Sequence, residues 1–366
     1  MCPNQTKMVN TDTIIFNVCV FISGLVLLER GADLFIDQAA ALAKRLGVPE
    51  VVIALLTAGA EWEELAVVVA SAVQRRPGLA FGNVFGSCIS NILGAFSLGQ
   101  LLFQPGVVHF DRSSKLYTVI NFLVTTVVSI LSLTGHLQKP EGIILIITFV
   151  LYVALVCWSI YRGMLAPPED SDSDSDTDSN SSGQSTAVTA DGDARAEDGD
   201  HVNESSPLFG SKKRQSPSTL SHVVKLITGF IALSVSGYLL SHSSKTLAEG
   251  FHISETAFGA TLLSLATTLP EKFIAILSGF RGREGIVVAN TVGSNIFLLT
   301  LCLGVAILSF DGVDGRASYF HEVGWMWASS AGLTLVILLG SHRMLGVVSL
   351  AAYVAFLVLE FTVYRA

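Results

Sequence analysis

The sequence predicts an all-α polytopic membrane protein in which ten transmembrane helices form two inverted five-helix repeats. Three observations carry this prediction: the composition, ten apolar segments of spanning length, and a polar motif that occurs twice. Of the 366 residues, 51% are hydrophobic and only 14% are charged, whereas a soluble domain carries about 25% charged residues. So few charges cannot cover a soluble core of this size, which argues against a soluble enzyme and against a nucleic-acid-binding protein.

The predicted spans are apolar stretches close to the roughly 20 residues that a helix needs to cross the hydrocarbon core. No basic segment precedes the first stretch, so we expect it to be a retained span rather than a cleaved signal peptide. The stretches cover residues 13–43, 49–73, 79–103, 116–135 and 142–162 in the first half, and 219–247, 256–280, 285–310, 325–341 and 344–363 in the second.

A polar segment divides the chain, and most of the net charge of -8 belongs to it. Twelve of the 30 acidic residues lie between Glu169 and Glu204. Such a segment buries too little apolar surface to offset its ordering entropy, so we expect it to be disordered. The predicted organisation is a first five-helix repeat over 1–164, an acidic cytoplasmic linker over 165–217 and a second five-helix repeat over 218–366.

Lys and Arg near the span ends predict the orientation, because cytoplasmic loops are enriched in them. Counting alternate loops gives twelve basic residues on the side of the linker and seven on the other. The linker is therefore expected in the cytoplasm and both termini on the opposite side. The sequence leaves the plasma membrane and a vacuole-like endomembrane equally open, and it does not indicate an oligomeric state.

The polar motif repeats at a constant offset of 207 residues. This offset superimposes Glu64 on Glu271 and Asn83 on Asn290, and the glycine and serine pair at 86 and 87 on the pair at 293 and 294. Each half has five predicted spans, an odd number, so the second copy enters the membrane from the opposite face. Transporters with inverted repeats bind their substrates near the bilayer midplane, where the two repeats meet.

Glu64 and Glu271 fall near the middle of the second and seventh spans, where an ionisable residue costs about 2.5–3.5 kcal/mol on insertion scales. Such residues usually face a partner or a pathway; the plainer alternatives are a solvent-facing helix end or a pairing with a cation such as Lys272. The two asparagines have an alternative role in helix capping or interhelical hydrogen bonds. The glycine and serine pairs have one in close helix packing.

Two converging carboxylates with hydroxyl, amide and carbonyl oxygens form a site suited to Ca²⁺, which takes 6 to 8 oxygen ligands. No His or Cys lies beside them in the spans to favour a softer metal. When Ca²⁺ leaves, Na⁺ or protons must compensate the two charges. We therefore expect Ca²⁺ and monovalent cations as substrates, the bilayer as the surrounding partner, and no cofactor.

These motifs resemble those of the calcium/cation antiporter superfamily, specifically the sodium/calcium exchanger membrane region. The second repeat, ATTLPE at 266–271 with ANTVGSNIF at 289–297, carries the resemblance most closely. It implies alternating access in a ten-helix antiporter whose two motif glutamates coordinate Ca²⁺. The ligands and path residues that it implies are Glu64 and Glu271 at the centre, then Thr57, Ala58, Ser264, Thr267, Asn83, Asn290, Ser87, Ser294 and Asn91.

The first repeat departs from the family pattern. Ala60 and Glu61 stand where a Thr-Ser pair is typical, Glu63 replaces proline, and Cys88 replaces the asparagine of GSN. In the second repeat Leu298 occupies the position of Asn91, which removes one polar ligand for Na⁺ or K⁺. Glu61 precedes Glu64 by three residues, on the same helical face, and could offset part of that loss.

The sequence therefore predicts a protein that is not an enzyme but a secondary active antiporter. It would exchange Ca²⁺ for Na⁺, with coupling to H⁺ or K⁺ left open. A Ca²⁺/H⁺ exchanger is the first alternative. A passive cation channel and a non-transporting membrane scaffold that uses the acidic linker are the alternatives from other classes.

Overall fold

The computed structural model describes residues 11–48, 60–103, 105–162, 219–310 and 319–363. Over these ranges the chain is helical, apart from an isolated antiparallel bridge between Val108 and Ser341. Eight of the described helices are long and apolar enough to cross a membrane, and a bent helix pair makes a ninth span. The predicted second span is described only from residue 60 onward, so its first part lies outside the described residues.

The helices follow the predicted stretches closely. The first half contains α1 (Thr11–Arg45), α3 (Trp62–Val73), α4 (Pro77–Ile89), η1 (Ser90–Phe96), α5 (Ser97–Leu101), α6 (Arg112–Thr134) and α7 (Lys139–Tyr161). The second contains α8 (Thr219–Phe251), α9 (Glu255–Phe258), η2 (Gly259–Leu263), α10 (Ser264–Thr267), α11 (Leu269–Phe280), α12 (Glu284–Phe297), η3 (Leu298–Cys302), α13 (Leu303–Ser309), α14 (Phe320–Leu339) and α15 (Arg343–Thr362).

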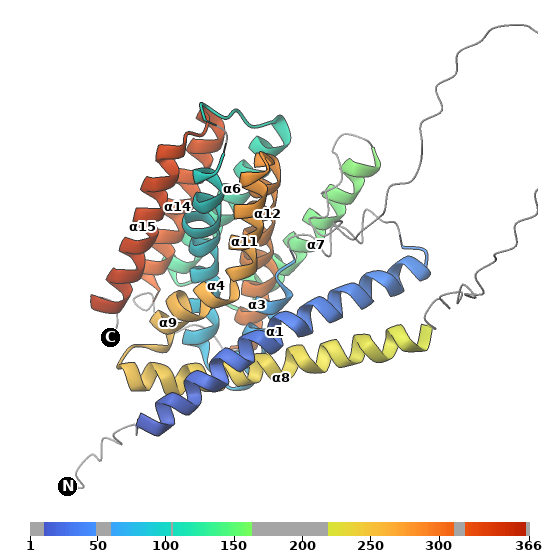
Figure 1. The fold of residues 1–366 in the computed structure, drawn as a ribbon, viewed down its shortest axis with the longest axis vertical. Coiled ribbons are helices and arrows are strands. Elements are labelled where there is room, and N and C mark those ends of the chain that lie inside the picture. Colours follow the sequence, from blue (N-terminus) through green and yellow to red (C-terminus); the bar gives the residue numbers. More distant parts are fainter. Residues whose placement is uncertain (1–10, 49–59, 104, 163–218, 311–318, 364–366) are drawn as a thin grey trace, which may run out of the picture.

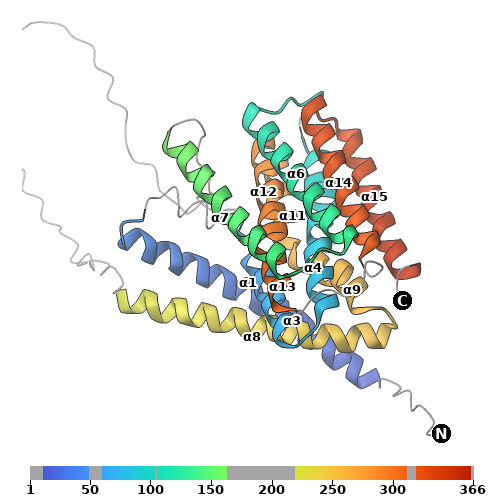
Figure 2. The same cartoon turned by 180° about the vertical axis from the view of Figure 1, so that it is seen from behind.

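The two longest helices, α1 and α8, lie side by side and cross the rest of the molecule obliquely (Figures 1 and 2). They are antiparallel, since Arg45 at the end of α1 donates a hydrogen bond of 3.0 Å to Thr219 at the start of α8. Shifting α1 by the repeat offset of 207 gives almost the range of α8. Helices that are equivalent in sequence thus run in opposite directions, as an inverted repeat requires.

The centre of the helical bundle is formed by the spans that carry the polar motifs. In the span Pro77–Leu101 all residues of the apolar stretch are buried, and in Glu284–Ser309 78% of them are. In α1 and α7 only 17% of the residues of the apolar stretch are buried. The outer helices α6, α14 and α15 stand around this centre (Figure 1). Their exposed large apolar side chains are suited to contact with lipid, so the polar residues of the motif are enclosed by protein.

Breaks in the helices fall at matching places in the two repeats. The helices α3 and α11 begin at Trp62 and Leu269, which are 207 residues apart. The π-helical segments η1 and η3 begin at Ser90 and Leu298, which lie one residue apart in the repeat register. Short π-helical insertions redirect side chains and are frequent at functional sites. Both repeats therefore loosen their helices beside the polar motif.

Candidate ion-binding site

The first acidic part of the site lies at the start of α3. Glu61 is the N-cap residue of this helix, without a capping hydrogen bond from its side chain, and Glu64 lies in the first turn. Both are buried, Glu64 completely. The side chain of Glu61 lies within interaction range of Glu64, Glu271 and Ser294. The spacing of three residues thus brings the additional glutamate of the first repeat next to the motif glutamate.

The second acidic part lies at a break in the seventh span. The segments 255–267 and 269–280 are bent by 49° relative to each other, with Thr268 at the break and Pro270 in the first turn of α11. Proline suits this position because it lacks the N–H that a first turn leaves unpaired. Glu271 in the same turn has a buried carboxylate oxygen, Oε2, without a hydrogen-bond partner.

Hydroxyl groups before the break are used within the helix. Ser264 donates to the carbonyl of Ala260 at 2.7 Å, and Thr268 donates to the carbonyl of Ser264 at 2.6 Å. Thr267 is buried, 3.5 Å from the same carbonyl oxygen of Ser264. Because these hydroxyls donate their protons to carbonyl groups, their oxygen lone pairs remain available to a cation. Thr57 and Ala58 lie outside the described residues.

Polar residues of α4 and α12 complete the surroundings. Asn83 and Ser87 are fully buried, and neither side chain has a hydrogen-bond partner in the described structure. The hydroxyl of Ser294 is likewise buried and unpartnered. Asn290 is only half-buried on α12 and differs in this from Asn83, its repeat equivalent.

Glycine allows α4 to approach the seventh span. A Cβ atom at Gly86 would lie 2.3 Å from the carbonyl oxygen of Ala260. Gly86 therefore has the role in close helix packing that the sequence offered as an alternative. This close approach also brings the adjacent Ser87 near the helix that carries Ser264. Around Gly293, the repeat equivalent, no atom of the described residues lies within 4 Å of such a Cβ.

A pair of asparagines joins the repeats. Asn91 donates from Nδ2 to Oδ1 of Asn295 at 3.3 Å, and Asn295 donates to the carbonyl of Cys88, also at 3.3 Å. Asn295 was not among the predicted ligands, although the sequence contained the signal: it is the asparagine of GSN, and the first repeat has Cys88 in its place. The other oxygen of this pair, Oδ1 of Asn91, has no partner.

More than half of the buried unpartnered side-chain atoms in the described structure belong to predicted site residues. They are both carboxylate oxygens of Glu64, one of Glu271, both amide atoms of Asn83, Oγ of Ser87 and of Ser294, and Oδ1 of Asn91. A buried polar group without a partner costs about 1–3 kcal/mol. Carboxylate, amide and hydroxyl oxygens are also the atom type that hard cations such as Ca²⁺ take as ligands.

The oxygen atoms do not yet form a closed chelate. Among the described residues no three His, Cys, Asp or Glu side chains are grouped closely enough to hold one metal ion. Two carboxylates would therefore need neutral oxygens to complete a coordination shell.

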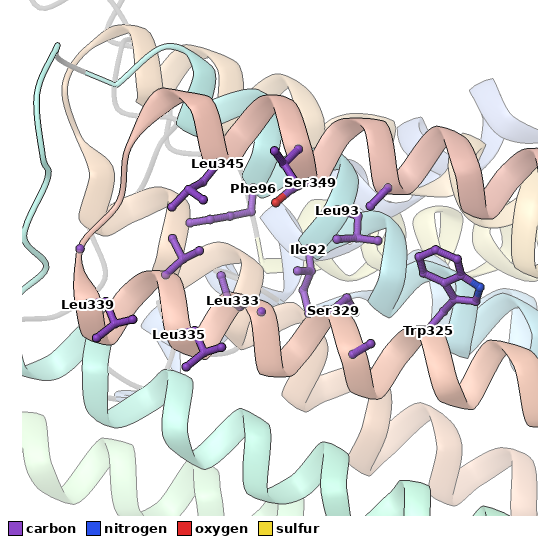
Figure 3. A pocket seen from close by; sticks show the side chains of 16 residues that line it. Ile92, Leu93, Phe96, Trp325, Ser329, Leu333, Leu335, Leu339, Leu345 and Ser349 are labelled. Atoms are coloured by element: carbon purple, nitrogen blue, oxygen red, sulfur yellow. The ribbon is translucent and has the colours of Figure 1, made fainter.

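An apolar cavity of about 420 Å³ between η1, α14 and α15 is lined by Leu93, Phe96, Trp325 and neighbouring side chains (Figure 3). Its few polar atoms make it unsuitable for a divalent ion.

A second pair of buried carboxylates lies on the outer helices α14 and α15. Glu322 is nearly buried and Glu360 completely so, and the two interact electrostatically. Oε2 of Glu322 and both carboxylate oxygens of Glu360 have no hydrogen-bond partner. The repeat comparison missed this pair because the equivalent positions in the first half hold Lys115 and Val153.

The chain is similar to known proteins over most of its length. A family model described as sodium/calcium exchanger protein matches residues 16–158 and 221–362. The sodium/calcium exchanger MaX1 of Methanosarcina acetivorans is 28% identical over 373 residues, covering 94% of this chain and 98% of that protein. The inner membrane protein YrbG of Escherichia coli is 25% identical over 312 residues, 84% of each chain. The solved structure of the sodium-calcium exchanger NCX_Mj matches with a TM-score of 0.55 at 23% identity, covering 93% of this chain and 98% of that one.

Proposed function

Because the chain belongs to the sodium/calcium exchanger protein family, we propose that it is a secondary active antiporter that moves Ca²⁺ in exchange for Na⁺. The ion would bind between the two repeats, with Glu64 and Glu271 as its charged ligands. The neutral oxygens of Asn83, Ser87 and Ser294 would contribute to the path. The observation that supports this most is the concentration of unpartnered buried oxygens on these residues.

The chemistry of exchange follows from charge balance. Two ionised carboxylates in a water-poor site repel each other strongly and need an ion of opposite charge. Ca²⁺ satisfies both, and when it leaves, monovalent cations must take its place before the empty site can reorient. Uncompensated reorientation is thereby disfavoured, which couples the two fluxes.

Exchange for H⁺ is the second candidate. It is favoured by the third carboxylate, Glu61, which is buried next to Glu64, and by Leu298, a buried apolar side chain at the repeat position of Asn91. Carboxylates can accept protons, whereas leucine cannot bind Na⁺. Loss of a polar ligand combined with gain of a carboxylate shifts a site from sodium toward proton coupling.

The test is ⁴⁵Ca²⁺ uptake into proteoliposomes with outward Na⁺, K⁺ or H⁺ gradients imposed separately. We expect uptake to require the Na⁺ gradient and to be lost in Glu64→Gln and in Glu271→Gln. Glu249→Gln is the matched control, because Glu249 is an exposed glutamate paired with Lys245 on α8. Uptake that is independent of the Na⁺, K⁺ and H⁺ gradients would refute antiport.

The rival classes give different results in the same preparation. A channel would produce Ca²⁺ currents without a counter-ion, which electrical recording across a planar bilayer detects. A scaffold would show no flux at all. Uptake that survives deletion of residues 165–217 and is lost in Glu271→Gln would exclude a scaffold that acts through the linker.

A further inference from the structure

Lys272 directly follows Glu271, and its side chain is only 7% exposed. The ammonium donates to Oγ of Ser90 at 2.8 Å, to the carbonyl of Thr268 at 3.0 Å and to Oγ1 of Thr268 at 2.5 Å. The aliphatic stem crosses Gly94 in η1, where a Cβ atom would lie 3.2 Å from Cε. The charged group is thus held at one place between the two repeats.

The hydrogen bonds match the donor pattern of an ammonium ion. The hydroxyl of Thr268 donates to the carbonyl of Ser264 and is therefore an acceptor for the lysine. The hydroxyl of Ser90 lies 2.9 Å from Oη of Tyr353 and 2.8 Å from Oγ1 of Thr268, so two other oxygens are in place to accept its proton. Three N–H donors thus meet three neutral oxygens, and a lysine ammonium has three donors and no acceptor.

The position of this ammonium is related to Glu61 by the repeat. Thr268, which binds it twice, is the residue that the offset of 207 superimposes on Glu61. One repeat therefore places an additional carboxylate at this position, and the other places a cation there. The ammonium interacts electrostatically with Glu271, Glu64 and Glu61. Glu61, Glu64, Glu271 and Lys272 together sum to a charge of -2, the magnitude that one Ca²⁺ balances; Glu63 also interacts electrostatically with Glu64 and Glu271 and stands outside this sum.

We propose that Lys272 is a built-in cation of the transport site, whose ammonium offsets the additional carboxylate of Glu61. The unloaded site then needs one monovalent cation fewer per Ca²⁺ than the same three carboxylates would need without the lysine. This inference rests on the proposed function. The negative charge of Glu61 and the positive charge of Lys272 thus compensate each other. Replacing both residues together should leave the net charge of the site unchanged.

The test is a charge cycle made in the full-length protein. Equilibrium ⁴⁵Ca²⁺ binding is measured in lipid nanodiscs, and the number of monovalent cations per Ca²⁺ is measured from reversal potentials in proteoliposomes. The variants are Glu61→Gln, Lys272→Gln and the double variant. Lys272→Arg keeps the charge, and Lys245→Gln removes an exposed lysine of α8 as the matched control.

We expect Glu61→Gln to weaken Ca²⁺ binding and Lys272→Gln to tighten it, each at least about tenfold for a unit charge in a poorly solvated site. Lys272→Gln should also raise the coupling ratio by one cation. The double variant should bind Ca²⁺ within about threefold of the wild type, because the opposite charge changes cancel. Lys272→Arg and Lys245→Gln should keep the wild-type coupling ratio.

A purely structural lysine predicts the opposite pattern: Lys272→Gln would weaken binding, and the double variant would bind no better than Glu61→Gln. Either result, or an unchanged coupling ratio in Lys272→Gln, overturns the inference. If Lys272→Gln does not fold, comparison of the double variant with Glu61→Gln still decides. Wild-type flux that is independent of the imposed gradients would refute the proposed antiport but not the inference about Lys272. The binding measurements on the variants need no gradient and test that inference separately.

Discussion

Replacement of Gly86 by alanine tests the contact that brings the two repeats together at the site. A Cβ atom at this position would lie 2.3 Å from the carbonyl oxygen of Ala260, 2.5 Å from its Cα and 2.6 Å from its carbonyl carbon. Ordinary contacts begin near 3.4 Å. All three atoms are backbone, so no side-chain rotation can relieve the overlap. The helix α4 and the segment η2 must therefore separate by about 1 Å, as the distances require.

The energetic cost follows from these distances. Overpacking a close-packed interior costs about 1–3 kcal/mol, and the rigid backbone places Gly86→Ala in the upper part of that range. The gain in helix propensity returns up to about 1 kcal/mol. A net loss of about 1–2 kcal/mol lowers Tm by about 1–3 °C at the size of this chain.

The assay is thermal unfolding of the purified protein in detergent, followed by intrinsic tryptophan fluorescence. Gly332→Ala is the control, because Gly332 is an exposed helical glycine with no described atom within 4 Å of its Cβ position. It gains helix propensity without a clash and should keep or raise Tm. An equal or higher Tm for Gly86→Ala than for the wild type would refute the reasoning.

Two further predictions concern a helix end and the asparagine pair. Asp111→Ala removes the N-cap of α6, which accepts from the amides of Ser113 and Ser114 at 3.1 Å each, and should cost about 1 kcal/mol. Burial tends to raise the Asp111 pKa, but these hydrogen bonds outweigh burial and leave the pKa below 3.8. The wild-type advantage in Tm should thus be present above about pH 4 and decline as pH falls through the lowered pKa; a difference that persists unchanged in acid would contradict this. Asn295→Ala loses the two hydrogen bonds of Asn295 to the first repeat and should cost about 1–3 kcal/mol and slow ⁴⁵Ca²⁺ uptake, whereas uptake at the wild-type rate would show that the pair is dispensable.

The spans and the repeat could be predicted because they depend on features that are local in the chain. Apolar stretches of sufficient length must be helical in a membrane, since the backbone has no other donor or acceptor there. The repeat is a matter of residue identity at one offset, and the antiparallel pairing of α1 with α8 agrees with it. The roles of Glu64 and Glu271 as ligands remain predictions; the complete burial of Glu64 and the unpartnered buried oxygens of both residues are consistent with them.

The contacts of Lys272 could not be predicted, because they join it to Ser90 of the other repeat, 182 residues away in the chain. The ammonium donates to Ser90 in η1, whose hydroxyl in turn lies beside Tyr353 in α15, and to Thr268 at the break before α11. The sequence left Lys272 as one possible partner of the glutamates, and it presented Glu61 as a departure from a family pattern. Apolar length and residue identity were enough to locate the membrane spans and the two repeats. Which buried charges offset each other depends on distances across helix interfaces, and those distances exist only once the repeats have packed together.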